Sequence, residues 1–295
     1  MISIENYLDA LEKELHGSDS ATIRDAKSDA EEYLRSAVEN MKEQNPELSY
    51  SEVVKICIEE YGAPEEIASA YKQVEEYLVP SYPPLKRREQ SSFWVSTFGI
   101  VADPRAWGSL LYMLLALITG IIYFSWAVTG ISLSVGLSIL IFGLPVAIIF
   151  LLSVKGISFL EGRLVEGLLG VQMPRRMSFT HPGMKFIDRL KHLTSDRYTW
   201  LSILYMILQL PLGIIYFTVI VTLISLVFGV FAIPVVQALF KYPTIYIGTI
   251  HYYFPTWSYP LLIAGGIVVF LVTMHLAKII GSIHGKFAKI MMVGN

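Results

Sequence analysis

The side chains best suited to binding a small molecule lie in one stretch, at about residues 235–259. This stretch is rich in tyrosine and proline and contains one histidine and one tryptophan. Rings with hydroxyl, imidazole and indole groups are common in ligand pockets, but they are also common where a membrane meets water. The stretch is therefore either a sensing site or a lid on the outer interface, and we favour the lid. The candidate binding residues are Tyr242, Tyr246, His251, Tyr253 and Trp257.

The remaining reactive residues form no catalytic or metal-binding pattern. The six histidines are dispersed, and Cys57 is the single cysteine, which excludes an internal disulfide and predicts a buried thiol. Gly265 and Gly266 lack the strand before them and the lysine after them that a phosphate-binding loop has. His275 and Lys278 share a helix face and form either a polar site or an interfacial anchor. We therefore expect a protein that is not an enzyme and that has no cofactor and no metal.

These residues are positioned by an apolar stretch that occurs twice. Trp107–Phe124 and Trp200–Phe217 align at an offset of 93 residues, and 12 of their 18 positions are identical. The identical positions include tryptophan, tyrosine and glycine, which a general apolar bias does not explain. Asp103 and Asp196 align at the same offset. The pattern indicates an internal duplication.

Each copy begins an uncharged run that is long enough to cross a hydrocarbon layer of about 30 Å as a helix. No Asp, Glu, Lys or Arg occurs from 106 to 154. A second apolar run follows each copy and carries an F-x-x-P-V element, at 142–146 and 231–235. The sequence predicts an all-α fold, with a four-helix transmembrane bundle made of two tandem two-span repeats at about 103–173 and 196–293.

Charge separates an acidic head from a basic membrane domain. Residues 1–78 contain 19 acidic and 7 basic residues, a net charge of −12, whereas the remainder contains 6 acidic and 16 basic residues, a net charge of +10. Helical periods interrupted near Gly17, Pro46 and Gly62 predict four helices in the head. In the third of these, the residues predicted to face inward are Val53, Val54, Ile56, Cys57 and Tyr61.

Three segments of the head carry a family resemblance. They read Y-L-D-A-L-E-K-E-L at 7–15, D-A-E-E-Y-L at 29–34 and E-E-Y-G-A-P-E-E-I-A at 59–68. Over about residues 3–75 the head resembles the HAAS signalling domain, a small all-helical module at the N-terminus of prokaryotic membrane proteins. The resemblance implies a regulatory, protein-binding role, often with a PadR-type transcription regulator, and it implies no catalytic residues.

The distribution of Lys and Arg predicts the topology. These residues gather in the connection 155–199 and in the C-terminal tail, whereas the turn near 129–134 has none. By the positive-inside rule the connection and both termini are cytoplasmic, and the two repeats are parallel copies in the plasma membrane. The basic cluster Lys86-Arg87-Arg88 either flanks the first span or contacts anionic lipid. The predicted domains are the head at 1–78, a linker and interfacial segment at 79–105, and a four-span domain at 106–295.

Two segments that follow the spans have the pattern of amphipathic helices on the inner membrane surface. The first segment, 156–172, places one apolar stripe opposite its charged residues. That stripe is made of Ile157, Leu160, Leu164, Leu168 and Val171, with Glu161, Arg163 and Glu166 elsewhere. The tail repeats the pattern with Ile279, Ile283, Phe287 and Ile290 beside His284, Lys286 and Lys289.

A second family resemblance covers about residues 93–293. Its segments are D-P-R-A-W-G-S-L-L-Y-M-L-L-A-L at 103–117, F-G-L-P-V at 142–146 and L-E-G-R-L-V-E-G-L-L-G at 160–170. They resemble the sensor membrane domain of prokaryotic histidine kinases. The second half departs most from the pattern of this family. Its surface segment reads I-H-G-K-F-A-K-I-M-M and keeps only a glycine followed by a basic residue. The resemblance implies sensing or signal transmission and supplies no binding residues.

We expect an integral membrane sensor or signalling adaptor that transmits a membrane or ligand signal to a cytoplasmic protein through the head. The expected partners are the lipid bilayer and a PadR-type regulator or a kinase, without direct nucleic-acid binding, and the oligomeric state is left open. The alternative is a transporter or a transporter's membrane subunit, although four spans without a buried charge make a poor ion-coupled pathway. A scaffold that holds a regulator at the membrane is a third interpretation.

Overall fold

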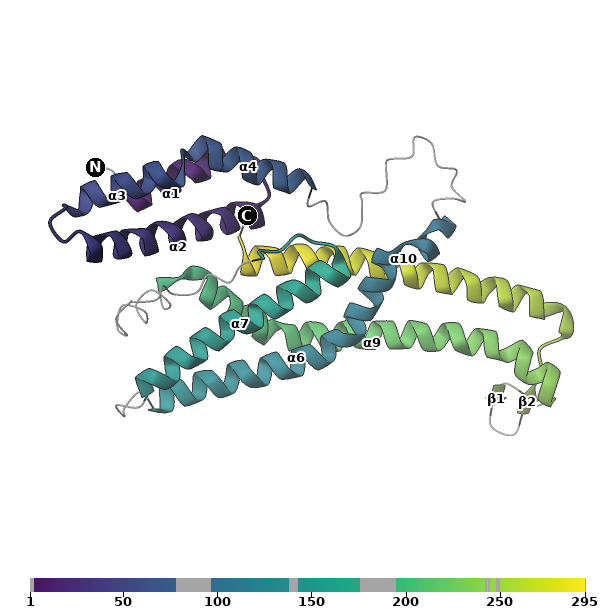
Figure 1. The fold of residues 1–295 in the computed structure, drawn as a ribbon. Helices are drawn as coiled ribbons and strands as arrows, with labels where there is room; N and C mark the ends of the chain where they lie inside the picture. The colour runs from purple at the N-terminus through teal and green to yellow at the C-terminus, as the bar shows by residue number, and fades with distance from the viewer. Residues whose placement is uncertain are drawn as a thin grey trace. The chain divides into compact units, whose positions relative to one another are not determined.

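The structure, a computed structural model (Figure 1), describes residues 3–77, 97–137, 143–175, 195–241, 243, 245–247 and 250–294. The basic cluster predicted at 86–88 lies outside these residues. The described chain is helical apart from one short pair of strands and divides into two compact units. The first unit combines Met1–Pro84, Ala127–Tyr205 and Lys286–Asn295, and the second combines Leu85–Trp126 and Met206–Gly285.

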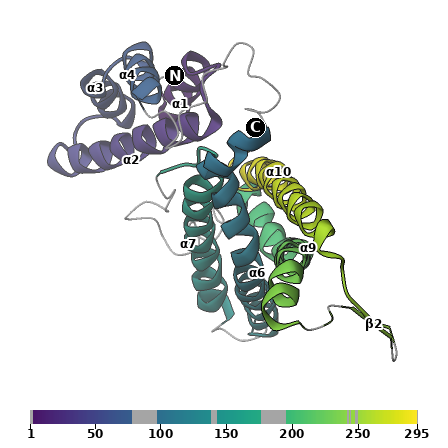
Figure 2. The ribbon, with the colours of Figure 1, turned by 90° about the vertical axis from the view of Figure 1, so that its right-hand side faces the viewer.

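Four helices form the head, as the sequence predicted. They are α1 (Ile4–Glu14), α2 (Ser20–Gln44), α3 (Tyr50–Tyr61) and α4 (Pro64–Tyr77), and α2 runs along one side of the other three (Figure 1 and Figure 2). Local chemistry fixes their starts, because Asp19 accepts the N–H of Ala21, and Ser49 forms a capping box with Glu52. Gly62 ends α3 at a φ of 115°, which glycine adopts without strain.

The head has an apolar core of its own. Leu11, Leu34 and Cys57 are fully buried in it, and burial raises the pKa of the Cys57 thiol. The predicted inward position of Ile56 is wrong, because its side chain is 41% exposed. A helix turns by about 100° per residue, so Ile56 falls outside the face that Val53 and Cys57 share.

We expect Leu34→Ala to destabilise the isolated head, residues 1–78, by about 2 to 5 kcal/mol, because the truncation leaves a cavity in a closed core. Urea unfolding followed by circular dichroism measures this change. Val74→Ala is the matched control, because Val74 is 50% exposed, and we expect its effect to stay within about 0.5 kcal/mol. Equal effects of the two substitutions would contradict a core that is internal to the head.

Four long apolar helices make up the rest of the described fold. They are α6 (Pro104–Gly136), α7 (Gly143–Leu169), α9 (Arg197–Phe240) and α10 (Tyr259–Met292). Each is long and apolar enough to cross a membrane. Their outer faces carry large apolar side chains, and Ile118, Phe228 and Val268 are each more than half exposed. Lipid solvates such a surface and water does not, so the chain is a multi-pass membrane protein, as predicted.

The second apolar run expected after the second copy is not a separate helix. Instead, α9 continues through Phe231–Val235 and ends at Phe240. A proline is tolerated within a membrane helix when neighbouring groups satisfy the backbone, and Pro234 accordingly lies inside α9. Pro145 lies near the start of α7. The two F-x-x-P-V elements therefore occupy different structural positions, and the prediction of equivalent second runs is wrong.

Within the second unit, two glycines that align in the sequence lie where α6 and α9 touch. A Cβ on Gly120 would lie 2.7 Å from the backbone oxygen of Gln209, and a Cβ on Gly213 would lie 2.3 Å from that of Ala116. The two contacts are reciprocal, because Gln209 is the position that aligns with Ala116. Glycine is needed at both positions for the backbones to approach this closely.

The two predicted surface segments continue the spans before them. Both α7 and α10 are unbroken, because no proline separates span from segment and an isolated glycine does not end a helix. Separate surface helices are therefore a wrong prediction. The apolar stripes point outward, with Leu160 60% and Ile283 62% exposed, whereas Glu161 and His284 are each 1% exposed. Glu161 and His284, on the polar sides of the two segments, pack against protein.

Candidate functional site

The predicted outer loop contains a hairpin that the sequence did not predict. Strands β1 (Ile245–Ile247) and β2 (Ile250–Tyr252) pair in antiparallel fashion, with Tyr246 opposite His251 (Figure 2). Each strand has three residues, which is too short for a recognisable period of two. The pairing places the backbones of two candidate binding residues next to each other.

Two other candidate residues of this loop are exposed. Tyr253 is 52% exposed and Trp257 is 71% exposed, and Tyr242 lies outside the described residues. The cavities described below are lined by other residues. Both the sensing site and the interfacial lid stay predictions.

A polar contact that sequence reasoning missed lies at the start of α6. One carboxylate oxygen of Asp103 accepts the N–H of Arg105 at 3.0 Å, and the other pairs with Nζ of Lys278 on α10 at 2.6 Å. The Asp103 side chain is 6% exposed, so this charge is buried and paired. His275 has a separate contact, because its Nδ1 lies 2.9 Å from the carbonyl oxygen of Leu271. Lys278 therefore has a buried carboxylate as its partner, and the polar site and the interfacial anchor stay alternative predictions.

The same arrangement recurs at the start of α9. Asp196 accepts the N–H of Tyr198 at 3.0 Å and the hydroxyl of Thr199 at 3.0 Å, and it pairs with Nζ of Lys155 on α7 at 3.2 Å. Burial alone would raise the pKa of Asp196. The charge of Lys155 and these hydrogen bonds outweigh burial, so the pKa lies below its usual value.

Both ion pairs connect the first helix of one copy to the second helix of the other copy. Asp103 lies in the first copy and Lys278 in the second, whereas Asp196 lies in the second copy and Lys155 in the first. The two lysines align when α7 is matched to α10 at an offset of 123 residues. The same offset aligns Glu161-Gly162-Arg163 with His284-Gly285-Lys286. This second offset is the signal that would have found both pairs.

The same pairing, of α6 with α10 and of α9 with α7, recurs nine residues further along α6 and α9. The hydroxyl of Tyr205 donates to Oε1 of Glu161 at 2.7 Å. The hydroxyl of Tyr112, which aligns with Tyr205, lies 2.7 Å from Nε2 of His284. All four side chains are buried. The two copies thus share one framework but hold different ionisable groups, a carboxylate in the first unit and an imidazole in the second.

The imidazole of His284 has hydroxyl groups at both ring nitrogens. Tyr216 places its hydroxyl 3.2 Å from Nδ1, while Tyr112 lies at Nε2 and also accepts a hydrogen bond from Nε2 of Gln209 at 3.1 Å. Such a network fixes the ring and the three helices that carry it. Among the residues that the structure describes, no group of three or more His, Cys, Asp or Glu side chains could hold a metal ion.

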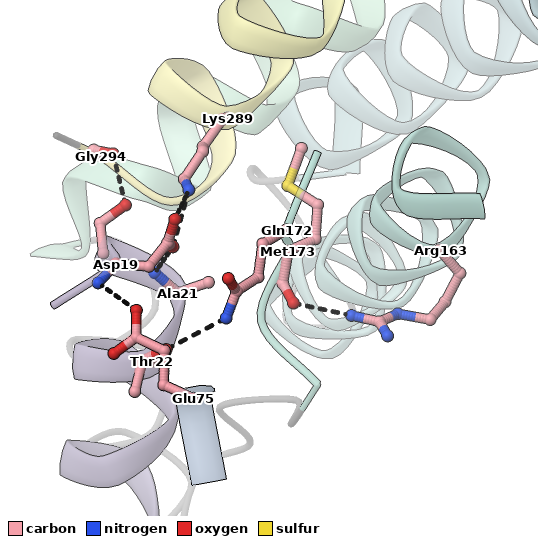
Figure 3. Close-up of polar contacts among 10 residues, drawn as sticks. Asp19, Ala21, Thr22, Glu75, Arg163, Gln172, Met173, Lys289 and Gly294 are labelled. Carbon is pink, nitrogen blue, oxygen red and sulfur yellow. Dashed lines mark hydrogen bonds and ion pairs between the residues drawn. The ribbon is translucent and has the colours of Figure 1, made fainter. Parts of the chain in front are cut away.

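Within the first unit, the start of α2 is bonded to the C-terminal tail (Figure 3). Lys289 on α10 pairs with both carboxylate oxygens of Asp19, at 2.5 and 2.7 Å. The hydroxyl of Ser20 donates to the carbonyl of Gly294 at 3.4 Å. The N–H of Asp19 also donates to Glu75 at 2.8 Å, which connects α4 to the same point.

The same end of α2 is bonded to the segment that follows α7, residues 170–175. The amide of Gln172 donates to the hydroxyl of Thr22 at 3.1 Å (Figure 3). The backbone N–H of Arg175 donates to the carboxylate of Asp25 at 2.8 Å. The head is therefore hydrogen-bonded both to the residues that follow α7 and to those that follow α10.

The segment after α7 is itself fixed to that helix. The guanidinium of Arg163 donates to the carbonyl oxygen of Met173 at 3.0 Å (Figure 3). It also donates to that of Pro174 at 2.5 Å. Arg163 also pairs with Glu166 one turn further along α7 at 2.5 Å. The segment that carries Gln172 is therefore held against α7 and is also hydrogen-bonded to α2.

Comparison with known families identifies the membrane part of the chain. The family model described as "Putative sensor" matches residues 112–292, which is more than half of the chain and leaves out the head. No curated protein and no solved structure matches the sequence.

Proposed function

The chain belongs to this sensor family, and we propose that it is a membrane sensor or signalling adaptor whose output is the N-terminal head. A membrane or ligand signal changes the packing of the four-span domain, and the head passes this change to a cytoplasmic protein. The proposed role is non-enzymatic. The resemblance of residues 3–75 to the HAAS signalling domain supports the assignment of the output to the head.

One observation carries this proposal: α2 is bonded both to the C-terminal tail at the end of α10 and to the segment after α7. Asp19 and Ser20 hold the tail after α10, while Thr22 and Asp25 hold the segment after α7. These four residues occupy two consecutive turns of one helix. A relative movement of α7 and α10 therefore pulls on a single rigid element of the head.

The crossed ion pairs and the reciprocal glycines support a sensor with two packings. Asp103 with Lys278 and Asp196 with Lys155 connect opposite copies, so a change in one copy alters the contacts of the other. The reciprocal contacts of Gly120 and Gly213 are those expected of duplicated parallel copies. A stimulus shifts the equilibrium by the difference in its affinity for the two packings.

We infer that both termini are cytoplasmic. Basic residues follow the apolar parts of α7 and α10, and the described ones include Lys155, Arg163, Arg175, Lys286 and Lys289. Lys and Arg are retained on the cytoplasmic side of membrane proteins. An acidic head on the same side as these residues is also favoured by charge.

The proposed output surface is an acidic hollow on the head. It has a volume of about 610 Å³ and is lined by Asp29, Glu32, Tyr33 and Tyr61, among others. The rings of Tyr33 and Tyr61 lie 4.8 Å apart. Carboxylates beside aromatic rings suit a basic segment of a protein partner. The proposed partner is a PadR-type regulator or a kinase that presents such a segment.

A carbodiimide, which couples a carboxylate directly to a neighbouring amine, tests the docking of the head. In the full chain in nanodiscs, we expect the Asp19–Lys289 cross-link to form at low salt. We expect its yield to fall severalfold at about 1 M salt, where the Debye length is about 3 Å. Peptide mass spectrometry gives the yield. The matched control is the Glu12–Lys27 pair, which lies within the head and is held together by the head's core.

A salt-independent Asp19–Lys289 yield would count against reversible docking. The output is tested separately by immobilising residues 1–78 and measuring the retention of purified candidate regulators. Retention that Glu32→Lys abolishes supports the acidic hollow. Substrate uptake by the purified chain in liposomes would instead favour the transporter interpretation.

A further inference from the structure

A small cavity lies within the first unit, beside the docked end of α2. Its volume is about 70 Å³. Its polar lining comes from three elements, with Arg24 on α2, Lys155 on α7, and Asp196, Thr199 and Ser202 at the start of α9. Ser158 and Tyr198, together with apolar residues of α7, of the segment after it and of the tail, complete the wall. A cavity of this size holds one small polar group.

The side chains that line the cavity carry unequal charges. Arg24 and Lys155 contribute two cations, and Asp196 contributes one carboxylate. Asp196 pairs with Lys155 at 3.2 Å. The charges of Asp196 and of Asp25, which lies outside the lining, act on Arg24, whose pKa is lowered mainly by burial. An excess positive charge within the lining is costly because its side chains are largely withdrawn from water. An anion in the cavity removes that cost.

Both cations retain donors for such an anion. Lys155 has three N–H groups, and Asp196 is the partner in its ion pair. The guanidinium of Arg24 has five N–H groups, of which one donates to the carbonyl of Met292, and its carbon lies 5.2 Å from the centre of the Tyr198 ring. Two basic groups that converge on one small space are typical of oxyanion recognition.

The cavity lies at the level where the apolar part of the chain ends. The uncharged run that begins at 106 stops at Lys155, and the run of α9 begins after Asp196 and Arg197. In a membrane this boundary coincides with the phosphate groups of the lipid. A phosphate there would contact the head through Arg24 and the membrane domain through Lys155.

We propose that this cavity binds a phosphate-type oxyanion, supplied by an anionic phospholipid headgroup or by free phosphate, and that the bound group bridges Arg24 of the head to Lys155 of the membrane domain. The inference goes beyond the proposed function, because binding is measured on the chain itself whether or not the head has a partner.

The test uses the full chain in a neutral detergent and measures ligand affinity by native mass spectrometry and by thermal shift. The probes are dioctanoyl phosphatidylglycerol, inorganic phosphate, and a dioctanoyl galactolipid that lacks phosphate. We expect Lys155→Gln and Arg24→Gln each to weaken binding of the phosphate-bearing probe about tenfold, because each removes a charged hydrogen-bond donor. The galactolipid should not bind at this site.

Two further variants separate binding from structural damage. Asp196→Asn keeps a side chain that caps α9 but removes the one negative charge, so it should strengthen binding. Lys278→Gln breaks the equivalent ion pair with Asp103, which lies outside this cavity, so it should leave binding unchanged.

The pattern across the probes identifies the source of the anion. Binding of phosphatidylglycerol without inorganic phosphate supports a lipid headgroup, and binding of both supports free phosphate as well. The proposal is overturned if no phosphate-bearing probe binds, if Lys155→Gln binds as the unaltered chain does, or if Asp196→Asn weakens binding as much as Lys155→Gln.

Discussion

Gly213→Ala is expected to destabilise the membrane domain by about 2 to 3 kcal/mol, because it overpacks the contact between α6 and α9. The added Cβ would lie 2.3 Å from the backbone oxygen of Ala116 and 2.7 Å from its carbonyl carbon. Neither atom can rotate away, so the helices must separate. Gly120→Ala should act in the same direction with a smaller effect, since its nearest atom, the oxygen of Gln209, lies at 2.7 Å.

The matched control for Gly213→Ala lies in the same helix. A Cβ on Gly229 would meet nothing within 4 Å, so Gly229→Ala should be neutral or stabilise the helix by up to about 1 kcal/mol. The midpoint of unfolding by sodium dodecyl sulfate in mixed micelles measures all three variants. Equal midpoints for Gly213→Ala and Gly229→Ala would mean that the close helix contact does not form.

The parts of the fold that depend on local sequence could be predicted from it. Helices α2 and α3 begin directly after Asp19 and Ser49 because these side chains cap the backbone N–H groups that follow them. The four spans could be predicted from their lack of charged residues. In lipid the backbone of such a stretch must satisfy its own hydrogen bonds, which a helix does without help from neighbouring segments. The inward position predicted for Ile56 is wrong because, in a nearly continuous run of apolar residues, the sequence pattern does not indicate which residues share the buried face.

The crossed contacts could not be found from the duplicated stretch alone. The first helices align at an offset of 93 residues, whereas α7 and α10 align at 123, because α9 is longer than α6 and a loop with a hairpin follows it. Glu161 was placed on the polar side of a surface helix. In lipid that side turns inward, where Tyr205 donates a hydrogen bond to it. A surface helix would leave that side facing water, whereas in this fold it packs against α9.

The two copies keep their framework and differ in the buried group. An aspartate caps the first helix, a lysine from the other copy pairs with it, and a tyrosine nine residues later contacts either Glu161 or His284. The shared parts position helices, which suits a stable scaffold. The difference gives the two aligned stretches unlike electrostatics. It supports the proposed sensor with two packings, because a stimulus with unequal affinity for the two packings shifts their equilibrium.

The capped ion pair at the start of α9 should be among the most important polar contacts for stability. We expect Asp196→Ala to cost about 3 kcal/mol, since it removes an N-cap worth about 1 kcal/mol and leaves Lys155 without its buried partner. The Lys155 and Asp196 side chains are 14% and 20% exposed, so the cost is smaller than for a fully buried pair. Asp196→Asn should cost about 1 kcal/mol less than Asp196→Ala, because asparagine still caps the helix.

The pH dependence of unfolding provides a second measurement of the same contact. The pKa of Asp196 in the folded chain lies below the unfolded value of 3.8, so its stabilising effect is fully present above pH 3.8. The effect is lost as the pH falls from 3.8 through the lower folded pKa. Asp196→Asn should therefore flatten the acid limb of the unfolding profile. An acid limb that Asp196→Asn leaves unchanged would show that Lys155 does not hold this carboxylate in its charged form.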